Sequence, residues 1–199
     1  MRIGLDLDGT LISCKEKHCA LMKSLARAFG INFDIDKYWE AKQNGKNNIA
    51  ALEMQNIDKE TAELLNTQWV AQIENIEWLY FDRVFDGVGQ ALDSLLEKKH
   101  TLHLVSARNN PQLGMLQLKQ LNIHNYFNTI DFIQISKGQN KKDTFKKLEL
   151  DMYIGDTEYD YMSSVEANTE CFLVESGMRN KQHLLKFSTN VYSNFYSIV

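Results

Sequence analysis

The sequence of 199 residues is poor in the features that mark several large classes of protein. It contains one proline and three cysteines, Cys14, Cys19 and Cys171, which cannot all pair within one chain and show no framework spacing. No CxxC pair or nearby pair of histidines completes a zinc site. We therefore expect free thiols in a reducing compartment.

Long apolar runs and an excess of basic residues are also missing. No apolar segment approaches the roughly 20 residues that span a bilayer, and the first residues enter an apolar strand without a basic leader. The 22 Lys and Arg residues are outnumbered by 26 Asp and Glu residues, which gives a net charge of −4. This balance argues against a nucleic-acid or membrane partner. We expect a cytoplasmic protein, and nothing in the sequence indicates an oligomeric state.

Hydrophobic residues are plentiful, at 44% of the chain, and their spacing changes along it. Residues 2–7 form an apolar run typical of a short buried strand. Residues 13–80 carry hardly any strand signal, and their apolar residues recur at helical spacing. Gly30, Asn44 with Gly45, and residues 56–58 are plausible breaks between helices. We interpret this stretch as a small all-helical unit.

After Asp86 and Gly87, predicted helices and strands alternate. We expect strands over 101–105, 130–133, 152–154 and 171–174, and helices over 88–96, 113–121, 142–148 and 159–167. Such alternation predicts a parallel sheet with helices on both faces. The tail from Phe187 to Val199 is compatible with either a last strand or an edge cover.

The expected fold class is therefore α/β, with a Rossmann-like parallel sheet core and an inserted all-helical cap. We assign residues 1–13 and 86–199 to the core domain and residues 14–85 to the cap domain. Ligands of such sheets bind beyond the carboxyl ends of the strands. An insertion that leaves from one of those ends would lie over the site like a lid.

Two carboxylates follow the first predicted strand, in Asp6-Leu7-Asp8-Gly9-Thr10. Residues two apart in an extended chain face the same side, so both carboxylates can face one point. Two close carboxylates repel unless a cation or a shared proton compensates. Hard oxygen ligands favour magnesium. Taken alone, Asp-x-Asp-Gly fits an acidic turn with a helix N-cap equally well.

A second group of polar residues follows the strand over 101–105. The hydroxyl of Ser106 and the backbone N–H groups around Ala107 could hold phosphate oxygens, although serine is also an ordinary loop residue. Arg108 is compatible with a phosphate contact or with a solvated side chain. From the later lysine-rich stretch we select Lys141, with Lys142 in reserve, to neutralise a transferring phosphoryl group.

The last group of polar residues follows the predicted strand over 152–154. Asp156 ends that strand and suits a metal ligand. Asp160 lies one helical turn further and would orient the ligand or bind through water, as carboxylates behind a metal site do. A helix N-cap with an acidic first turn would explain either residue alone.

The four groups together resemble the four motifs of the haloacid dehalogenase superfamily. The resemblance rests on Asp6-Leu7-Asp8-Gly9-Thr10, Ser106, Lys141 and the run from Gly155 to Asp160, in the right order and at suitable spacing. It covers the core, whereas residues 14–85 match the helical cap in position and length only. Ser13 and Asp86 depart from the acid and the proline that many relatives carry there.

The resemblance implies a magnesium-dependent phosphatase that acts on a small phosphorylated metabolite. Asp6 would attack phosphorus and form an aspartyl-phosphate, while Asp8 would protonate the leaving oxygen and then activate water. Magnesium would be held by Asp6, the Asp8 carbonyl and Asp156, and Ser106, Ala107 and Lys141 would bind the phosphoryl oxygens. A phosphotransferase or mutase and a non-catalytic binding protein on the same fold are the alternatives.

Overall fold

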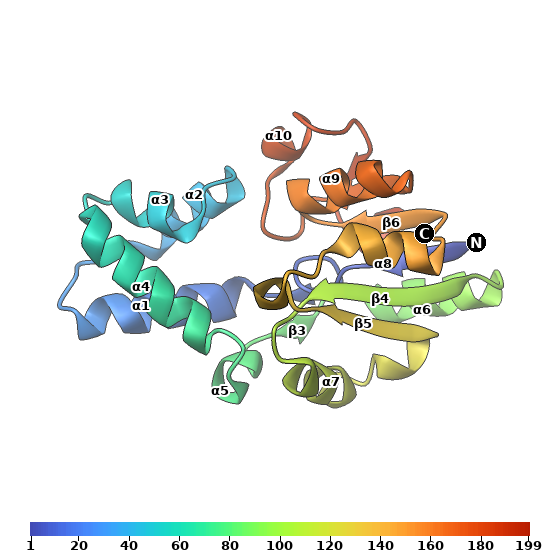
Figure 1. The fold of residues 1–199 in the computed structure, drawn as a ribbon, viewed down its shortest axis with the longest axis horizontal. Coiled ribbons are helices and arrows are strands. Elements are labelled where there is room, and N and C mark those ends of the chain that lie inside the picture. Colours follow the sequence, from blue (N-terminus) through green and yellow to red (C-terminus); the bar gives the residue numbers. More distant parts are fainter.

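The computed structural model describes residues 1–199, arranged as two units that lie side by side (Figure 1). One is built around a β-sheet and is called the sheet unit. The other, residues 15–79, contains helices only and is called the helical unit. The chain enters the helical unit after residue 14 and returns from it after residue 79, so the helical unit interrupts the sheet unit near the start of the chain.

The sheet has six parallel strands in the order β5-β4-β1-β6-β7-β8. Their bounds are β1 (Arg2–Leu5), β4 (Thr101–Ala107), β5 (Thr129–Ile133), β6 (Met152–Gly155), β7 (Glu170–Val174) and β8 (Val191–Tyr192). The first strand lies inside the sheet, between β4 and β6, so the strand order reverses beside β1. Ligands of open α/β sheets bind at such a reversal, at the carboxyl ends of the strands.

Helices cover both faces of the sheet because successive strand residues face opposite sides. On one face, Leu104 and Ile154 belong to the main apolar cluster with Leu92 of α6. On the other face, Val105 and Tyr153 pack with Phe145 of α8. The helices of this unit are α6 (Val88–Glu97), α7 (Pro111–Gln120), α8 (Lys141–Leu148), α9 (Glu158–Ala167) and α10 (Lys181–Leu184).

The helical unit has an apolar cluster of its own, which includes Tyr38, Leu52 and Leu65. Side-chain caps start three of its helices, because Asp34, Asn47 and Asp58 accept hydrogen bonds from the first-turn N–H groups. Its helices are α1 (Lys15–Ala28), α2 (Ile35–Gln43), α3 (Asn48–Glu53), α4 (Lys59–Gln72) and α5 (Ile76–Leu79). None of the helices in the protein has both the length and the apolar character needed to cross a bilayer.

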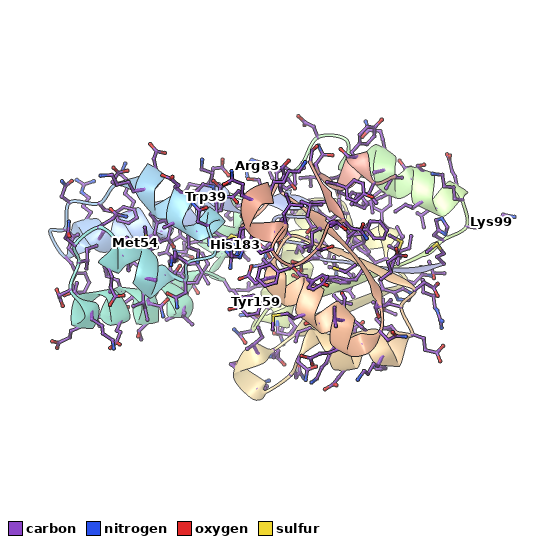
Figure 2. All side chains as sticks on the ribbon, turned by 90° about the horizontal axis from the view of Figure 1, so that it is seen from above. Trp39, Met54, Arg83, Lys99, Tyr159 and His183 are labelled. Atoms are coloured by element: carbon purple, nitrogen blue, oxygen red, sulfur yellow. The ribbon has the colours of Figure 1, made fainter.

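Two very short strands join the units, β2 (Ile12–Ser13) and β3 (Arg83–Val84), which pair antiparallel. Both crossings of the chain between the units therefore lie next to each other. Lys99, just before the start of β4, lies at the end of the sheet unit that points away from the helical unit (Figure 2). The carboxyl ends of the strands consequently face the helical unit.

The expected α/β fold with a parallel sheet is confirmed, and the expected breaks at Gly30, Gly45 and residues 56–58 fall between helices. The tail combines both alternatives that the sequence left open. Val191 and Tyr192 add the last parallel strand to β7, while Phe195, in the short 3₁₀ helix Phe195–Ser197, is buried in the main apolar cluster with α6. The pairing of β2 with β3 was not predicted, since two-residue strands show no periodicity.

Candidate active site

The side chains singled out in the sequence come together at the carboxyl edge of the sheet. Asp6 follows β1, Ser106 lies near the end of β4, Lys141 begins α8 and Asp156 follows β6. All four line one cavity of about 670 Å³. The parallel sheet causes this convergence, because strands that run in the same direction end at the same edge.

Three buried carboxylates, those of Asp6, Asp156 and Asp160, place oxygen atoms within 4.8 Å of one another. Burial raises the pKa of Asp6 to about 6, against the pull of Lys141. Burial and the neighbouring carboxylates of Asp160 and Asp6 also raise the pKa of Asp156 well above its usual value. Negative charge is thus concentrated where water cannot screen it, so a cation would stabilise the ionised forms.

The carboxylate of Asp160 is occupied by protein donors. Its Oδ2 accepts hydrogen bonds from the backbone N–H groups of Asp156 and Thr157, at 3.2 and 3.1 Å, and from the Thr157 hydroxyl at 2.7 Å. Its Oδ1 lies 2.6 Å from Lys141 Nζ. Asp160 therefore holds the loop after β6 and the lysine in position, which leaves Asp6 and Asp156 as the more open carboxylates.

These residues fit a divalent cation such as magnesium. Asp6 Oδ1 is buried without a hydrogen bond, although Lys141 Nζ lies 3.0 Å away as an ion-pair partner. A Cβ on Gly9 or on Gly177 would lie 2.1 Å from Asp156 Oδ2, so both positions require glycine for this carboxylate to fit. Carboxylate oxygens are the ligands that magnesium prefers.

Lys141 reaches the site and Lys142 does not. Lys141 Nζ lies between Asp6, Asp160 and the hydroxyl of Tyr153, which is 3.0 Å away. Burial alone would lower the pKa of Lys141, but the carboxylates of Asp160 and Asp6 hold it well above its usual value. Lys142 instead pairs with Glu166 at 2.8 Å on the outside of α8 and α9.

Asp8 turns away from the three carboxylates and contacts two cations. Its Oδ2 lies 2.7 Å from Arg108 Nη2, and its Oδ1 lies 3.0 Å from Lys17 Nζ. Burial alone would raise the pKa of Asp8, but Arg108 and Lys17 hold it well below its usual value. The sequence allowed either a phosphate contact or a solvated side chain for Arg108. The second interpretation is wrong, because Arg108 is 4% exposed.

A buried network extends from Asp8 to the junction of the two units. Lys17 Nζ also lies 2.6 Å from Asp82, which accepts a hydrogen bond from Gln117 Nε2 at 2.7 Å. Gln117 accepts one in turn from Arg108 at 3.0 Å. Sequence reasoning missed Lys17, Asp82 and Gln117, since these partners lie far apart along the chain.

The remaining expected phosphate contacts, Ser106 and Ala107, both line the cavity where β4 ends. Ser106 is buried, whereas Ala107 is exposed to the cavity. The helical unit contributes further lining residues that the sequence did not single out for this site, among them His18 from α1 and Trp69 from α4. His18 is a half-buried residue of the cavity wall.

Comparison with protein families identifies one match. A family described as haloacid dehalogenase-like hydrolase matches residues 3–174, which covers most of the chain and includes Asp6, Asp8, Ser106, Lys141, Asp156 and Asp160. Comparison of the sequence with curated proteins gives no match.

Solved structures with the same fold cover nearly the whole chain. A protein from Clostridium acetobutylicum, provisionally named a phosphatase, superposes with a TM-score of 0.71 at 24% identity, over 96% of this chain and 93% of that chain. One from Clostridium difficile, also provisionally named a phosphatase, gives 0.78 at 17% identity, over 98% and 95%. A third, from Lactobacillus delbrueckii subsp. bulgaricus and provisionally named a phosphoglycolate phosphatase, gives 0.72 at 15% identity, over 99% and 95%. These similarities establish the shared fold.

Proposed function

This chain belongs to the haloacid dehalogenase-like hydrolase family, and we propose that it is a magnesium-dependent phosphatase that forms a covalent intermediate on Asp6. The observation that carries the proposal is the placement of Lys141 3.0 Å from Asp6, beside the carboxylate of Asp156. A buried carboxylate next to a fixed cation and further metal-ligand oxygens is suited to attack the phosphorus of an anionic ester.

The first half-reaction transfers the phosphoryl group to Asp6. An Asp6 oxygen forms a bond to phosphorus while the bond from phosphorus to the ester oxygen breaks, and the departing alcohol takes a proton from Asp8. Arg108 and Lys17 keep Asp8 ionised in the free protein. We propose that the entering phosphate competes for these two cations, so that Asp8 takes up a proton from solvent and then passes it to the departing alcohol.

The second half-reaction returns Asp6 to its starting state. Asp8 is now a carboxylate and takes a proton from a water molecule, whose oxygen attacks phosphorus as the bond to Asp6 breaks. The products are inorganic phosphate and the free Asp6 carboxylate. Lys141 neutralises charge on the phosphoryl oxygens throughout, while Ser106 and the backbone N–H of Ala107 orient them.

Asp6, Asp156 and the backbone carbonyl of Asp8 would hold the magnesium ion. When bound, it supplies positive charge that lowers the repulsion between the carboxylate nucleophile and the phosphate. Asp160 contributes indirectly, because it fixes both Lys141 and the loop that carries Asp156.

We further propose that residues 14–85 form a cap domain over a core of residues 1–13 and 86–199. The helical unit supplies part of the cavity wall, and it also contacts the loop after β7. Arg179 donates a hydrogen bond to the carbonyl of Lys42 at 2.9 Å, and Asn180 N–H donates one to Gln43 at 3.0 Å. A cap of this kind would exclude water during turnover.

The three buried free thiols support our expectation of a reducing, cytoplasmic location.

Release of inorganic phosphate tests the proposed function. Purified protein should hydrolyse 4-nitrophenyl phosphate and at least one phosphorylated metabolite in the presence of magnesium, and excess EDTA should abolish both reactions. Full activity in EDTA would contradict the metal site. Transfer of the phosphoryl group to an added alcohol or sugar in preference to water would indicate a phosphotransferase instead.

A further inference from the structure

The part of the cavity wall that comes from the helical unit is aromatic and aliphatic apart from Lys17 and Glu74. His18 of α1, Trp69 and Val70 of α4, and Ile73 directly after α4 form this apolar part. The rings of His18 and Trp69 meet edge to face, with centroids 4.9 Å apart. Burial and the neighbouring Lys17 lower the pKa of His18, so its ring is neutral. This wall therefore offers flat aromatic and aliphatic surface to the part of a substrate that leaves with the ester oxygen.

Every cation that lines the cavity is already paired with protein carboxylates. Lys141 pairs with Asp6 and Asp160, and Arg108 pairs with Asp8. Lys17 contacts Asp8 and Asp82. The phosphate itself requires such partners, so no cation is left over for a second anionic group on the substrate. A carboxylate on the leaving group would therefore lack a cationic partner in the cavity, which is unfavourable.

The carboxylate of Glu74 reinforces this selectivity. Glu74 lines the cavity and accepts hydrogen bonds from the backbone N–H groups of Asn109 and Asn110, at 2.9 and 2.7 Å. The negative charge is thus fixed between the helical unit and the loop after β4. It would repel an anionic leaving group and would not repel a neutral one.

Two nitrogen atoms of this wall have no partner in the protein. His18 Nδ1 and Trp69 Nε1 are both buried without a hydrogen bond. Buried polar atoms normally have a partner, and these two nitrogen atoms are open to hydrogen bonds with a bound ligand. The cavity volume of about 670 Å³ lies in the range that holds drug-sized ligands, and a two-carbon leaving group would leave much of it unfilled.

We propose that the substrate is a phosphate monoester of an uncharged alcohol that carries a planar ring, and that the ring packs against Trp69 and His18. Nucleoside 5′-monophosphates are one readily available class of compound that matches this description. The inference rests on the proposed phosphatase function and adds the chemical class of the leaving group. A short phospho-acid such as phosphoglycolate is the substrate class that it disfavours.

Three substrates with the same kind of primary-alcohol ester test the inference. Nucleoside 5′-monophosphates, ribose 5-phosphate and phosphoglycolate differ in having a ring base, no base, or a second anionic group. Stacking of a base on an aromatic side chain typically corresponds to about tenfold to a hundredfold in affinity. We expect kcat/KM for the best nucleotide to exceed that for ribose 5-phosphate by this factor, and phosphoglycolate to be the poorest of the three.

Substitution of Trp69 should remove the preference without removing the chemistry. Trp69→Ala should reduce the ratio of kcat/KM for the best nucleotide to that for ribose 5-phosphate to about one, whereas Trp69→Phe should retain most of the preference. Trp78→Ala is the matched control, because Trp78 of α5 stacks on Phe81, which follows that helix, and does not line the cavity. An unchanged preference in Trp69→Ala would overturn the inference.

A charge variant tests the same wall without disturbing packing. Val70 lines the cavity and is 56% exposed, while Leu64 on the same helix is 45% exposed and lies outside the cavity. Val70→Lys should raise kcat/KM for phosphoglycolate relative to ribose 5-phosphate at least severalfold, because it supplies the missing cation. Leu64→Lys should leave that ratio unchanged, and equal effects of the two variants would contradict the charge argument.

Calorimetry with non-hydrolysable phosphonate analogues of the best nucleotides and of phosphoglycolate separates the two proposals. Hydrolysis of 4-nitrophenyl phosphate together with a preference for phosphoglycolate would overturn the inference and leave the phosphatase standing. Tight binding of the nucleotide analogue without hydrolysis of any ester would overturn the phosphatase and support the ligand class. The absence of both binding and hydrolysis would overturn both the phosphatase proposal and the proposed ligand class.

Discussion

The ammonium group of Lys17 lies 2.6 Å from the carboxylate of Asp82, and both side chains are almost completely buried. Lys17 belongs to the first helix of the helical unit, and Asp82 lies on the segment by which the chain returns to the sheet. The same lysine lies 3.0 Å from Asp8. Lys17 thus links the two chain crossings between the units to Asp8, the residue proposed as the general acid and base.

Replacement of Lys17 should destabilise the protein strongly. Lys17→Met removes the cation that Asp82 and Asp8 share, and breaking a buried pair typically costs about 3–5 kcal/mol because a charge remains unpaired. Denaturant unfolding measures this loss. Lys59→Met is the control, since Lys59 is exposed and pairs with Glu63 at 3.8 Å on the surface of α4. Its expected cost is about 0.5 kcal/mol or less, and similar losses for both variants would contradict the importance of the buried network.

Two neighbouring lysines at the start of α8 should differ sharply in their effect on activity. Lys141 contacts Asp6 in the site, whereas Lys142 pairs with Glu166 outside it. Lys141→Met should lower kcat for 4-nitrophenyl phosphate by about 10²–10³-fold, as expected for loss of one group that stabilises the transition state. Lys142→Met should retain kcat within about twofold. If the two variants lost activity equally, the assignment of Lys141 would fail.

The space beside Asp156 gives a third prediction. A Cβ on Gly177 would lie 2.1 Å from Asp156 Oδ2, while a Cβ on Gly89 in α6 would meet only the Tyr126 hydroxyl at 3.8 Å. Gly177→Ala should displace the carboxylate, so that magnesium affinity measured by calorimetry falls at least tenfold. Gly89→Ala should leave magnesium affinity unchanged and stabilise the fold by up to about 1 kcal/mol, because alanine is the better helix former. Unaltered magnesium affinity in Gly177→Ala would contradict the proposed role of Asp156.

Burial of two carboxyl groups should make stability depend on pH, and magnesium should reduce the part that comes from Asp6. Asp6 and Asp82 have pKa values of about 6 in the folded protein, above the usual 3.8. At these two carboxyl groups the folded state binds more protons than the unfolded state between about pH 6 and 4, so their contribution to stability rises as the pH falls through this window. His18 contributes with the opposite sign, because its pKa is lowered in the folded protein. Without metal, Tm should therefore increase from pH 7 to pH 5 relative to the Tm of Asp6→Asn.

Bound magnesium should keep Asp6 ionised and reduce this increase in Tm, because it offsets the burial that favours the protonated carboxyl group. The Asp6→Asn variant should lose part of the increase and its magnesium dependence together. Parallel Tm curves with and without magnesium would contradict a metal site at Asp6.

The parts of the protein that could be predicted from sequence are those with local patterns. The strands before Asp6 and Asp156 are marked by a short apolar run followed by an acidic residue, and the parallel topology then brings these two residues to one edge of the sheet. The network around Lys17 has no such signal. Its partner Asp82 is 65 residues away, and the Asp82–Gln117 contact spans 35 residues. In the sequence Lys17 resembles any surface lysine of a helix, and only the packing of the two crossings buries it.

The choice between Lys141 and Lys142 could not be predicted from the sequence either, although the two residues are neighbours. Both lysines stand at the start of one helix, and a difference of one residue turns a side chain by about a quarter of a turn around the helix. Asn140 caps α8 by accepting a hydrogen bond from Asp143 N–H. This fixes where the helix begins, and the packing of Phe145 against Tyr153 then fixes which lysine faces Asp6.

Trapping of the covalent intermediate tests the central claim most directly. Asp8→Asn keeps the Asp6 nucleophile but removes the base that activates water, a loss of about 10²–10⁴-fold. 4-Nitrophenolate needs little protonation to leave, so rapid acid quench of Asp8→Asn with ³²P-labelled 4-nitrophenyl phosphate should yield labelled protein. The label should map to Asp6 by mass spectrometry and should be absent in Asp6→Asn. Turnover of Asp6→Asn at the wild-type rate, or label on another residue, would contradict the account.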